Sequence, residues 1–167
     1  MNIARLARCV ALLPLVAASA VSATEMSNPL VDHVRVANNR FKEVAVAVEE
    51  GYAPIPCTSG IDGGAMGVHY VNSAYLKDAV PDLKRPQAVM YEPLPNGTME
   101  LIAVEYITFK GPASLEGQLF SFTNAPNRYG LDPFYELHVW AWKQNLHGAF
   151  TDMNPKVTCD HATAHVK

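Results

Sequence analysis

Four segments rich in β-branched and aromatic residues dominate the sequence after residue 65. They cover residues 66–72, 87–92, 98–109 and 134–143, and each is bounded by Gly, Pro or Asn. Val, Ile, Tyr, Phe and Trp favour the pleated surface of a β-sheet, whereas Gly, Pro and Asn end strands. Asn96-Gly97, between the second and third segments, is a pair that adopts the positive φ of a hairpin turn. The pattern therefore predicts an antiparallel sheet.

A helical pattern precedes these segments. Between residues 28 and 50, apolar residues recur at steps of three and four: Leu30, Val34, Ala37, Phe41, Val44 and Val48. Ser27 or Asn28 is suited to cap this helix, and Gly51 to end it. The order predicts an α+β fold in which one N-terminal amphipathic helix packs on one face of the sheet. We also expect a helical turn over 76–83, a short strand over 118–122 and irregular chain over 52–65.

The first residues have the pattern of a signal peptide. Arg5 and Arg8 precede an apolar run over residues 10–21, and small residues follow, so cleavage is predicted after Ala23. The run is interrupted by Pro14 and is shorter than the roughly 20 residues of a spanning helix, so an uncleaved anchor is the weaker interpretation. We expect residues 1–23 to be removed and residues 24–167 to form a single periplasmic or secreted domain with no stable membrane insertion.

Charge and composition exclude several classes of protein. Loss of Arg5 and Arg8 leaves 11 basic side chains against 16 acidic ones, a net charge of −5. An acidic domain of this kind has no electrostatic attraction for phosphate backbones, so no nucleic-acid partner is expected. The chain is 49% hydrophobic and 17% charged, which excludes a disordered protein and allows one ordinary core.

The cysteine count predicts one disulfide bond. Cys9 leaves with the signal peptide, so only Cys57 and Cys159 remain in an oxidising compartment. A thiolate metal site is the alternative, but the sequence lacks the Cys-x-x-Cys pair that such sites normally use.

Two blocks of sequence carry a resemblance. Residues 63–72 read GGAMGVHYVN and residues 135–143 read YELHVWAWK, followed by Asn154-Pro155 and Cys159. Together they resemble a group of uncharacterised small exported bacterial proteins over most of the mature chain. The resemblance implies a shared fold, leaves a shared site open and implies no reaction. Met153 stands where that group tends to have Trp, and His147 lies outside the pattern, so His147 is a poor candidate for a common function.

Polar residues within the predicted strands form a candidate metal site. Alternation over residues 134–143 puts Glu136 and His138 on the face opposite Leu137 and Val139. Glu105 is an acid in an apolar row of residues 98–109, and a buried carboxylate needs a partner. With His69, these groups could hold a divalent ion such as Zn, Cu or Fe. Strand order and register decide whether they converge, and the sequence leaves open whether the two carboxylates share a face.

Three further residues are candidates for contact with a small ligand. Trp140 and Trp142 continue the row of Glu136 and His138 and could form a pocket floor, although indoles also serve as ordinary packing residues. Arg128 lies in the turn-like stretch 127–130 and could approach a carboxylate or an anionic ligand.

Three functional hypotheses follow from these residues. The first is an exported protein that binds a metal ion or small molecule in a sheet pocket lined by His and Glu. The second is a metal-dependent enzyme that uses the same residues, with a metal-activated water or a redox metal. The third is a disulfide-linked structural or interaction domain in which the polar groups satisfy one another. The first requires the fewest assumptions, and the sequence indicates no oligomeric state.

Overall fold

The fold is an antiparallel sheet with helices on one side. The computed structural model describes residues 28–60 and 63–162, so the predicted signal peptide and its cleavage site lie outside the described residues. The strands of the main sheet follow the order β1-β3-β4-β5-β9-β8, and β2 also pairs with β3. All of these pairings are antiparallel. The predicted α+β class with an antiparallel sheet is confirmed.

The strands lie close to the segments that their composition indicates. Their bounds are β1 Tyr52–Pro54, β2 Thr58–Ser59, β3 Ala65–Asn72, β4 Ala88–Pro93, β5 Met99–Thr108, β6 Ser114–Leu115, β7 Gln118–Leu119, β8 Ser121–Thr123 and β9 Phe134–Val139. The predicted hairpin is present, because β4 and β5 are antiparallel neighbours joined by the turn that contains Gly97. The expectation of irregular chain over 52–65 is wrong, since β1 and β2 both add to β3.

The last long strand ends earlier than its composition suggests. β9 stops at Val139, whereas the aromatic run continues to residue 143. The backbone amides of Trp142 and Lys143 both donate to the carbonyl of Ile102, so the chain leaves the regular ladder at this point. A row of alternating side chains ends with the ladder, and the residues beyond Val139 therefore take separate directions.

The predicted single helix over residues 28–50 is wrong in detail. The segment forms α1 (Pro29–Asn38), a 3-10 turn η1 (Asn39–Lys42) and α2 (Val44–Glu49). Glu43 has extended backbone angles of φ −91° and ψ 104°, which interrupt the helical register. As a result Ala47 is buried and Val48 is 55% exposed, the reverse of the expected helical face. Further along, α3 (Ser73–Asp78) overlaps the helical turn predicted over 76–83 only at residues 76–78.

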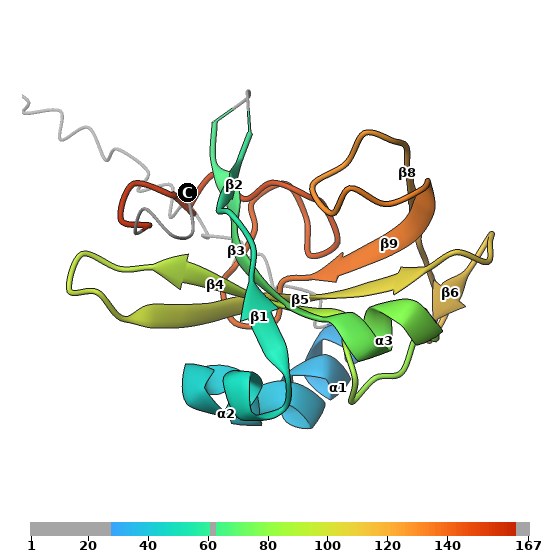
Figure 1. Ribbon diagram of the computed structural model, residues 1–167, viewed down its shortest axis with the longest axis horizontal. Coiled ribbons are helices and arrows are strands. Elements are labelled where there is room, and N and C mark those ends of the chain that lie inside the picture. Colours follow the sequence, from blue (N-terminus) through green and yellow to red (C-terminus); the bar gives the residue numbers. More distant parts are fainter. Residues whose placement is uncertain (1–27, 61–62, 163–167) are drawn as a thin grey trace, which may run out of the picture.

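The sheet has an apolar core on each face. On the helical side, Leu30, Val34 and Phe41 belong to the same cluster as Val104 and Leu137 of the sheet. The opposite face has a second cluster: Ala65, Met66, Met90, Ile102, Ala103, Trp140 and Val157. Figure 1 shows α1 and α2 below the sheet, with the loop before β9 and the C-terminal segment above it. Residues that alternate along β4 and β5 therefore belong to different cores.

A disulfide bond and a backbone bridge fix the C-terminal segment. Cys57 and Cys159 are bonded across 102 residues of sequence, as predicted. Ala65 and Asn154 exchange two backbone hydrogen bonds of 3.1 and 3.0 Å. A Cβ atom on Gly64 would lie 2.3 Å from the carbonyl oxygen of Asn154, and the φ of Gly64 is +90°, so this close approach requires glycine.

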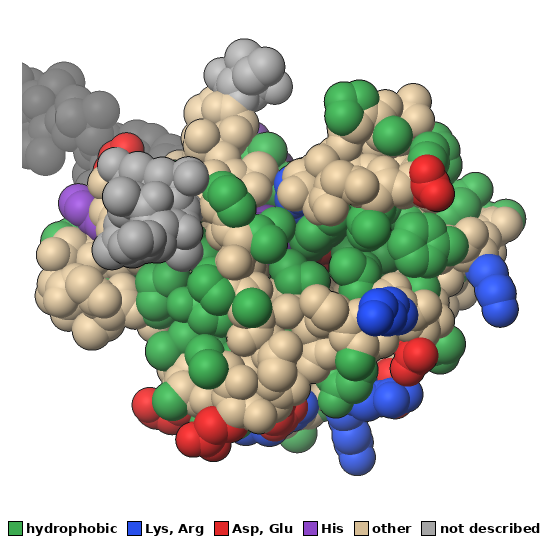
Figure 2. Space-filling view, viewed as in Figure 1, with side chains coloured by type: hydrophobic (Ala, Val, Ile, Leu, Met, Phe, Trp, Pro, Cys, Tyr) green, Lys and Arg blue, Asp and Glu red, His purple; other side chains and the backbone are tan. Residues whose placement is uncertain are grey.

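Charged side chains are unevenly distributed over the surface. Figure 2 shows acidic and basic side chains of this face gathered mainly over the helical side, below a surface of hydrophobic and neutral groups. Within the described residues, no helix has both the length and the apolar character needed to cross a membrane.

Candidate functional site

Strand register brings the predicted polar residues to one face of the sheet. Glu105 on β5 is directly opposite His138 on β9, and directly opposed residues of antiparallel strands point to the same side. His69 lies on β3, separated from β5 by β4. On β4 the residue paired with Glu105 is Ala88, whose small side chain leaves room above the strand. This face lies opposite α1 and α2 (Figure 1).

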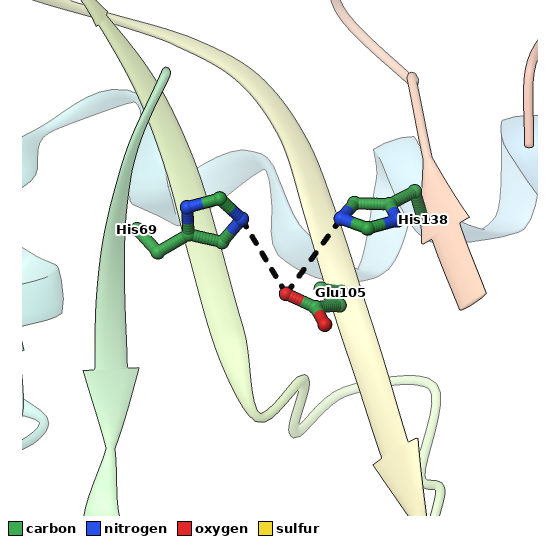
Figure 3. Close-up of side chains that lie close together, drawn as sticks. All are labelled: His69, Glu105 and His138. Atoms are coloured by element: carbon green, nitrogen blue, oxygen red, sulfur yellow. Dashed lines mark ion pairs between the residues drawn. The ribbon is translucent and has the colours of Figure 1, made fainter. Parts of the chain in front are cut away.

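Three side chains converge at the centre of this face. Oε2 of Glu105 lies 3.5 Å from Nε2 of His69 and 3.7 Å from Nε2 of His138 (Figure 3). These three candidate ligand atoms all lie within 4.8 Å of one another. The side chains of His69 and Glu105 are fully buried, and that of His138 is 1% exposed. Two imidazoles and a carboxylate thus meet in a dry part of the protein.

The loop before β9 covers this group with two further polar side chains. Nη2 of Arg128 donates to Oε1 of Glu105 at 2.5 Å and also donates to Oε2 of Glu136. The hydroxyl of Tyr129 donates to Oε2 of Glu105, the oxygen that faces both histidines. The two carboxylates therefore share one face and one guanidinium, which answers the question that the sequence left open.

A third carboxylate approaches from the C-terminal segment. Oδ1 of Asp152 lies 3.3 Å from Nδ1 of His138, and the Asp152 side chain is 51% exposed. Glu136, His138 and Asp152 also form a group whose candidate ligand atoms lie within 4.8 Å of one another. An acidic neighbour at Nδ1 favours the tautomer that keeps the proton there. Nε2 of the ring then lies 3.4 Å from Nη2 of Arg128 and 3.7 Å from Oε2 of Glu105.

Both ring nitrogens of His69 are buried without a hydrogen-bond partner among the described residues, and the side chain is fully buried. Burying a polar group without a hydrogen bond costs about 1–3 kcal/mol in proteins. The position of His69 therefore lowers the stability of the fold unless its Nε2 atom binds a ligand such as a metal ion.

Burial and charge shift the pKa values at the centre of the site. Burial raises the pKa of Glu105 to about 7, against the lowering effect of the charges on Arg128 and His138. Burial, together with the charges of Arg128 and His138, lowers the pKa of His69 well below its ordinary value. At neutral pH the His69 ring is therefore uncharged and has a lone pair available, and the Glu105 carboxyl group is about half protonated.

The surroundings favour the charged forms of Glu136 and His138 and the neutral form of Tyr129. Burial alone would raise the pKa of Glu136, but His138, Glu105 and Arg128 together lower it to about 2. Burial opposes the charge on His138, while Glu105 and Asp152 overcome it and raise the pKa of the ring. The pKa of Tyr129 lies well above its ordinary value, through burial and the charge of Glu105, so in this arrangement Tyr129 is a hydrogen-bond donor.

The predicted aromatic ligand surface is not formed as expected. Trp140 is 3% exposed, packs in the apolar cluster beside Met90 and Ala103, and donates its Nε1 proton to the carbonyl of Thr151. Trp142 packs against the helical-side core, because β9 ends before it. Both line a cavity of about 540 Å³ beside the start of α1, which is separate from the His and Glu cluster. Trp140 therefore stays on the face of Glu136 and His138 as a packing residue, whereas Trp142 lies on the other side of the sheet.

Arg128 does approach carboxylates, and its loop supplies a residue that sequence reasoning missed. Tyr129 has no strand periodicity to mark it, and its only signal is its position next to Arg128. Asp152 lies in an irregular segment after β9, where spacing carries no information about contact. Both residues reach the cluster through loops, whose paths depend on the complete fold.

The fold and the site define a class: an α+β protein with an antiparallel sheet, one disulfide bond and a buried His/Glu group that could hold a metal ion. Comparison of the chain with family models, with curated proteins and with solved structures finds no match. The resemblance to small exported bacterial proteins thus stays a prediction.

Proposed function

We propose that this is an exported protein that binds one divalent transition-metal ion through His69, Glu105 and His138. The observation that carries the proposal is His69, a fully buried imidazole whose ring nitrogens lack hydrogen bonds and whose Nε2 points at Glu105 and His138. Coordination would satisfy this nitrogen and offset its desolvation. Imidazole and carboxylate donors suit Zn, Cu and Fe, the ions expected from the residue types.

The spacing of the donor atoms supports coordination. Around a tetrahedral ion with bonds of roughly 2.0–2.1 Å, neighbouring donor atoms lie about 3.4 Å apart. The measured separations from Oε2 of Glu105 are 3.5 Å to His69 and 3.7 Å to His138. The two distances from Oε2 are therefore close to those around one ion, and the two Nε2 atoms lie within 4.8 Å of each other.

The charges of the cluster also match a divalent ion. Glu105, Glu136 and Asp152 supply three negative charges, and Arg128 supplies one positive charge. With neutral imidazoles and a neutral Tyr129, these groups carry a net charge of −2. A divalent cation would neutralise the group, whereas protons on Glu105 and His138 serve this purpose without an ion. A divalent ion would thus take the place of two protons in this cluster.

Neighbouring side chains hold the proposed ligands in position. Asp152 faces Nδ1 of His138, and Arg128 and Tyr129 hold the two oxygens of Glu105. Partners of this kind orient metal ligands, and their loss typically weakens metal binding by about 10–100-fold. The site is thus supported by contacts from β9, the preceding loop and the C-terminal segment.

Export is part of the proposal. We propose that residues 1–23 direct the chain out of the cytoplasm and that residues 24–167 act in the periplasm or outside the cell. The disulfide between Cys57 and Cys159 supports this, because such bonds persist in oxidising compartments. The proposed partners are accordingly a metal ion or a small molecule, and the proposal includes no nucleic acid.

A metal-dependent enzyme is the second candidate. The observation that favours it is the number of strand-borne donors, since His69, Glu105 and His138 supply three ligands and catalytic zinc sites have three protein ligands plus a water. Turnover by the metal-loaded protein, absent from the metal-free protein, would support this second candidate over simple binding.

Metal content tests the proposal directly. The full chain is exported, purified without an affinity tag, and analysed for metals before and after loading with Zn, Cu and Fe. We expect close to one ion per chain, and we expect its loss in a His69→Ala, His138→Ala double variant. His147→Ala is the matched control, because His147 is exposed and belongs to neither group of candidate metal ligands in the described residues.

Folding is checked separately from metal uptake. Glu105→Gln keeps the size of the side chain, so it serves as a milder variant if the double variant does not fold. Failure of the unaltered protein to take up any of the three metals would overturn the proposal. Equal metal loss in the His147→Ala control would likewise exclude the strand-borne site.

A further inference from the structure

One side chain close to the proposed metal position, Tyr129, only positions Glu105 in the three-ligand site, although its oxygen could itself bind a metal. The Tyr129 hydroxyl contacts Oε2 of Glu105, the same atom that faces Nε2 of both histidines. Its ring lies edge-on to His69, with centroids 6.0 Å apart. The phenol oxygen thus lies against the carboxylate oxygen that faces both proposed histidine ligands.

Packing holds the Tyr129 ring in this position. The ring is tilted against Phe134, with centroids 5.8 Å apart, and the guanidinium carbon of Arg128 lies 4.8 Å from its centroid. Phe134 is fully buried at the start of β9, and Arg128 is tied to Glu105 and Glu136. The hydroxyl therefore remains beside Glu105 whether or not its hydrogen bond to that oxygen is kept.

We infer that Tyr129 is a fourth protein ligand of the metal, so that the site is His69, Glu105, His138 and Tyr129 and accepts ferric iron. This inference rests on the proposed metal site; it adds a fourth ligand, whose negative charge lets the site take a trivalent ion as well as the divalent ions proposed above. Four protein ligands are one more than the three that catalytic zinc sites have.

In coordination by Tyr129, the phenolate oxygen replaces a water molecule of the ferric ion, and that water leaves to the solvent. The O–H bond of the phenol breaks, an oxygen–metal bond forms, and the proton leaves to the solvent, with no electron transferred. Glu105 loses the hydrogen bond from Tyr129 and gains the metal in its place. Deprotonated Tyr129 adds one negative charge to the net −2 of Glu105, Glu136, Asp152 and Arg128, and a charge of −3 matches a trivalent ion.

Phenolate bound to ferric iron absorbs visible light, which gives a direct test. The purified full chain is loaded with ferric ion alone, and separately with Zn(II), and both metal content and visible absorption are measured. We expect a charge-transfer band in the ferric protein. In Tyr129→Phe we expect complete loss of this band, while Zn(II) content stays close to one ion per chain.

The controls separate this inference from the proposed function. Tyr135→Phe is the matched variant, since Tyr135 is a half-buried tyrosine on β9 whose ring packs against Phe122 instead of the cluster, and it should keep the band. If Tyr129→Phe does not fold, resonance Raman spectra of the unaltered ferric protein should show enhanced tyrosine ring vibrations. Zn(II) binding without a Tyr129-dependent band or such vibrations would overturn the fourth ligand alone. Absence of both metals would overturn the metal site and the inference together.

Discussion

Replacement of Arg128 by Met is expected to destabilise the metal-free protein strongly. Nη2 of Arg128 donates to both Glu105 and Glu136, whose side chains are 0% and 1% exposed. Methionine fills much of the same volume but supplies no charge. The variant therefore leaves two buried carboxylates without their shared cation, while the apolar packing of the loop is largely kept.

The magnitude follows from the burial of the pair. Removal of one partner of a buried ion pair costs about 3–5 kcal/mol, whereas exposed pairs contribute about 0.2–1 kcal/mol. The Arg128 side chain is only 12% exposed, so the larger range applies. Arg85→Met is the matched control, because the side chains of Arg85 and Asp82 are 47% and 39% exposed. We expect a loss of about 3–5 kcal/mol for Arg128→Met and less than about 1 kcal/mol for Arg85→Met.

Urea unfolding with a metal chelator present measures this difference. Because the pKa of Glu136 is lowered to about 2, its contribution is present above the ordinary pKa of a carboxyl and is lost as the pH falls toward 2. The difference between Arg128→Met and the unaltered protein should therefore persist at pH 5 and shrink at lower pH. A triple variant that also carries Glu105→Gln and Glu136→Gln should recover part of the stability. A loss as small as that of the Arg85→Met control would refute the reasoning.

Three further predictions concern the disulfide, the pH dependence of metal binding and one glycine. Replacement of Cys57 and Cys159 by Ser opens a loop of 102 residues and should lower the free energy of unfolding by about 4–5 kcal/mol in urea titrations; an unchanged midpoint would contradict this. Metal affinity should fall as the pH drops below 7, because the pKa of Glu105 is about 7 and this ligand must lose its proton to bind the metal. The expected decrease is about tenfold per pH unit for each proton released. A metal affinity that stays constant from pH 5 to 8 in direct titrations would argue against Glu105 as a ligand. Gly67→Ala should lower the melting temperature, since φ is +88° and the added Cβ would lie 2.5 Å from the carbonyl oxygen of Tyr91, and a melting temperature equal to that of the unaltered protein would disprove this close approach.

Local composition was enough to predict the strands but not the way the site assembles. The segments that became β3, β4 and β5 were correct to within one residue at each end, because short runs of β-branched and aromatic residues between turn residues have few other stable conformations. The meeting of His69 with Glu105 depends on register across three strands, and a shift of one residue would reverse each side chain. Sequence alone therefore named these residues without placing them together.

The errors have local causes that periodicity does not detect. Glu43 interrupts the helical segment by its backbone angles, so the apolar repeat continues in sequence while the helix does not. Two amides that share the carbonyl of Ile102 end β9 before Trp140, so Trp142 faces the opposite core. Tyr129 and Asp152 come from loops, and a loop contact is fixed only once the sheet below it has formed.

The disulfide has a consequence for the order of assembly. Every side chain of the cluster, from His69 to Asp152, belongs to the stretch of chain between Cys57 and Cys159. Oxidation of the two thiols turns this stretch into a covalent ring, and ring closure raises the effective concentration of each donor near the others. A chain that acquires its ion after oxidation would search fewer conformations than a reduced chain. Reducing conditions would then lower the amount of bound metal although no ligand is changed. The redox state of Cys57 and Cys159 would thus affect metal binding indirectly.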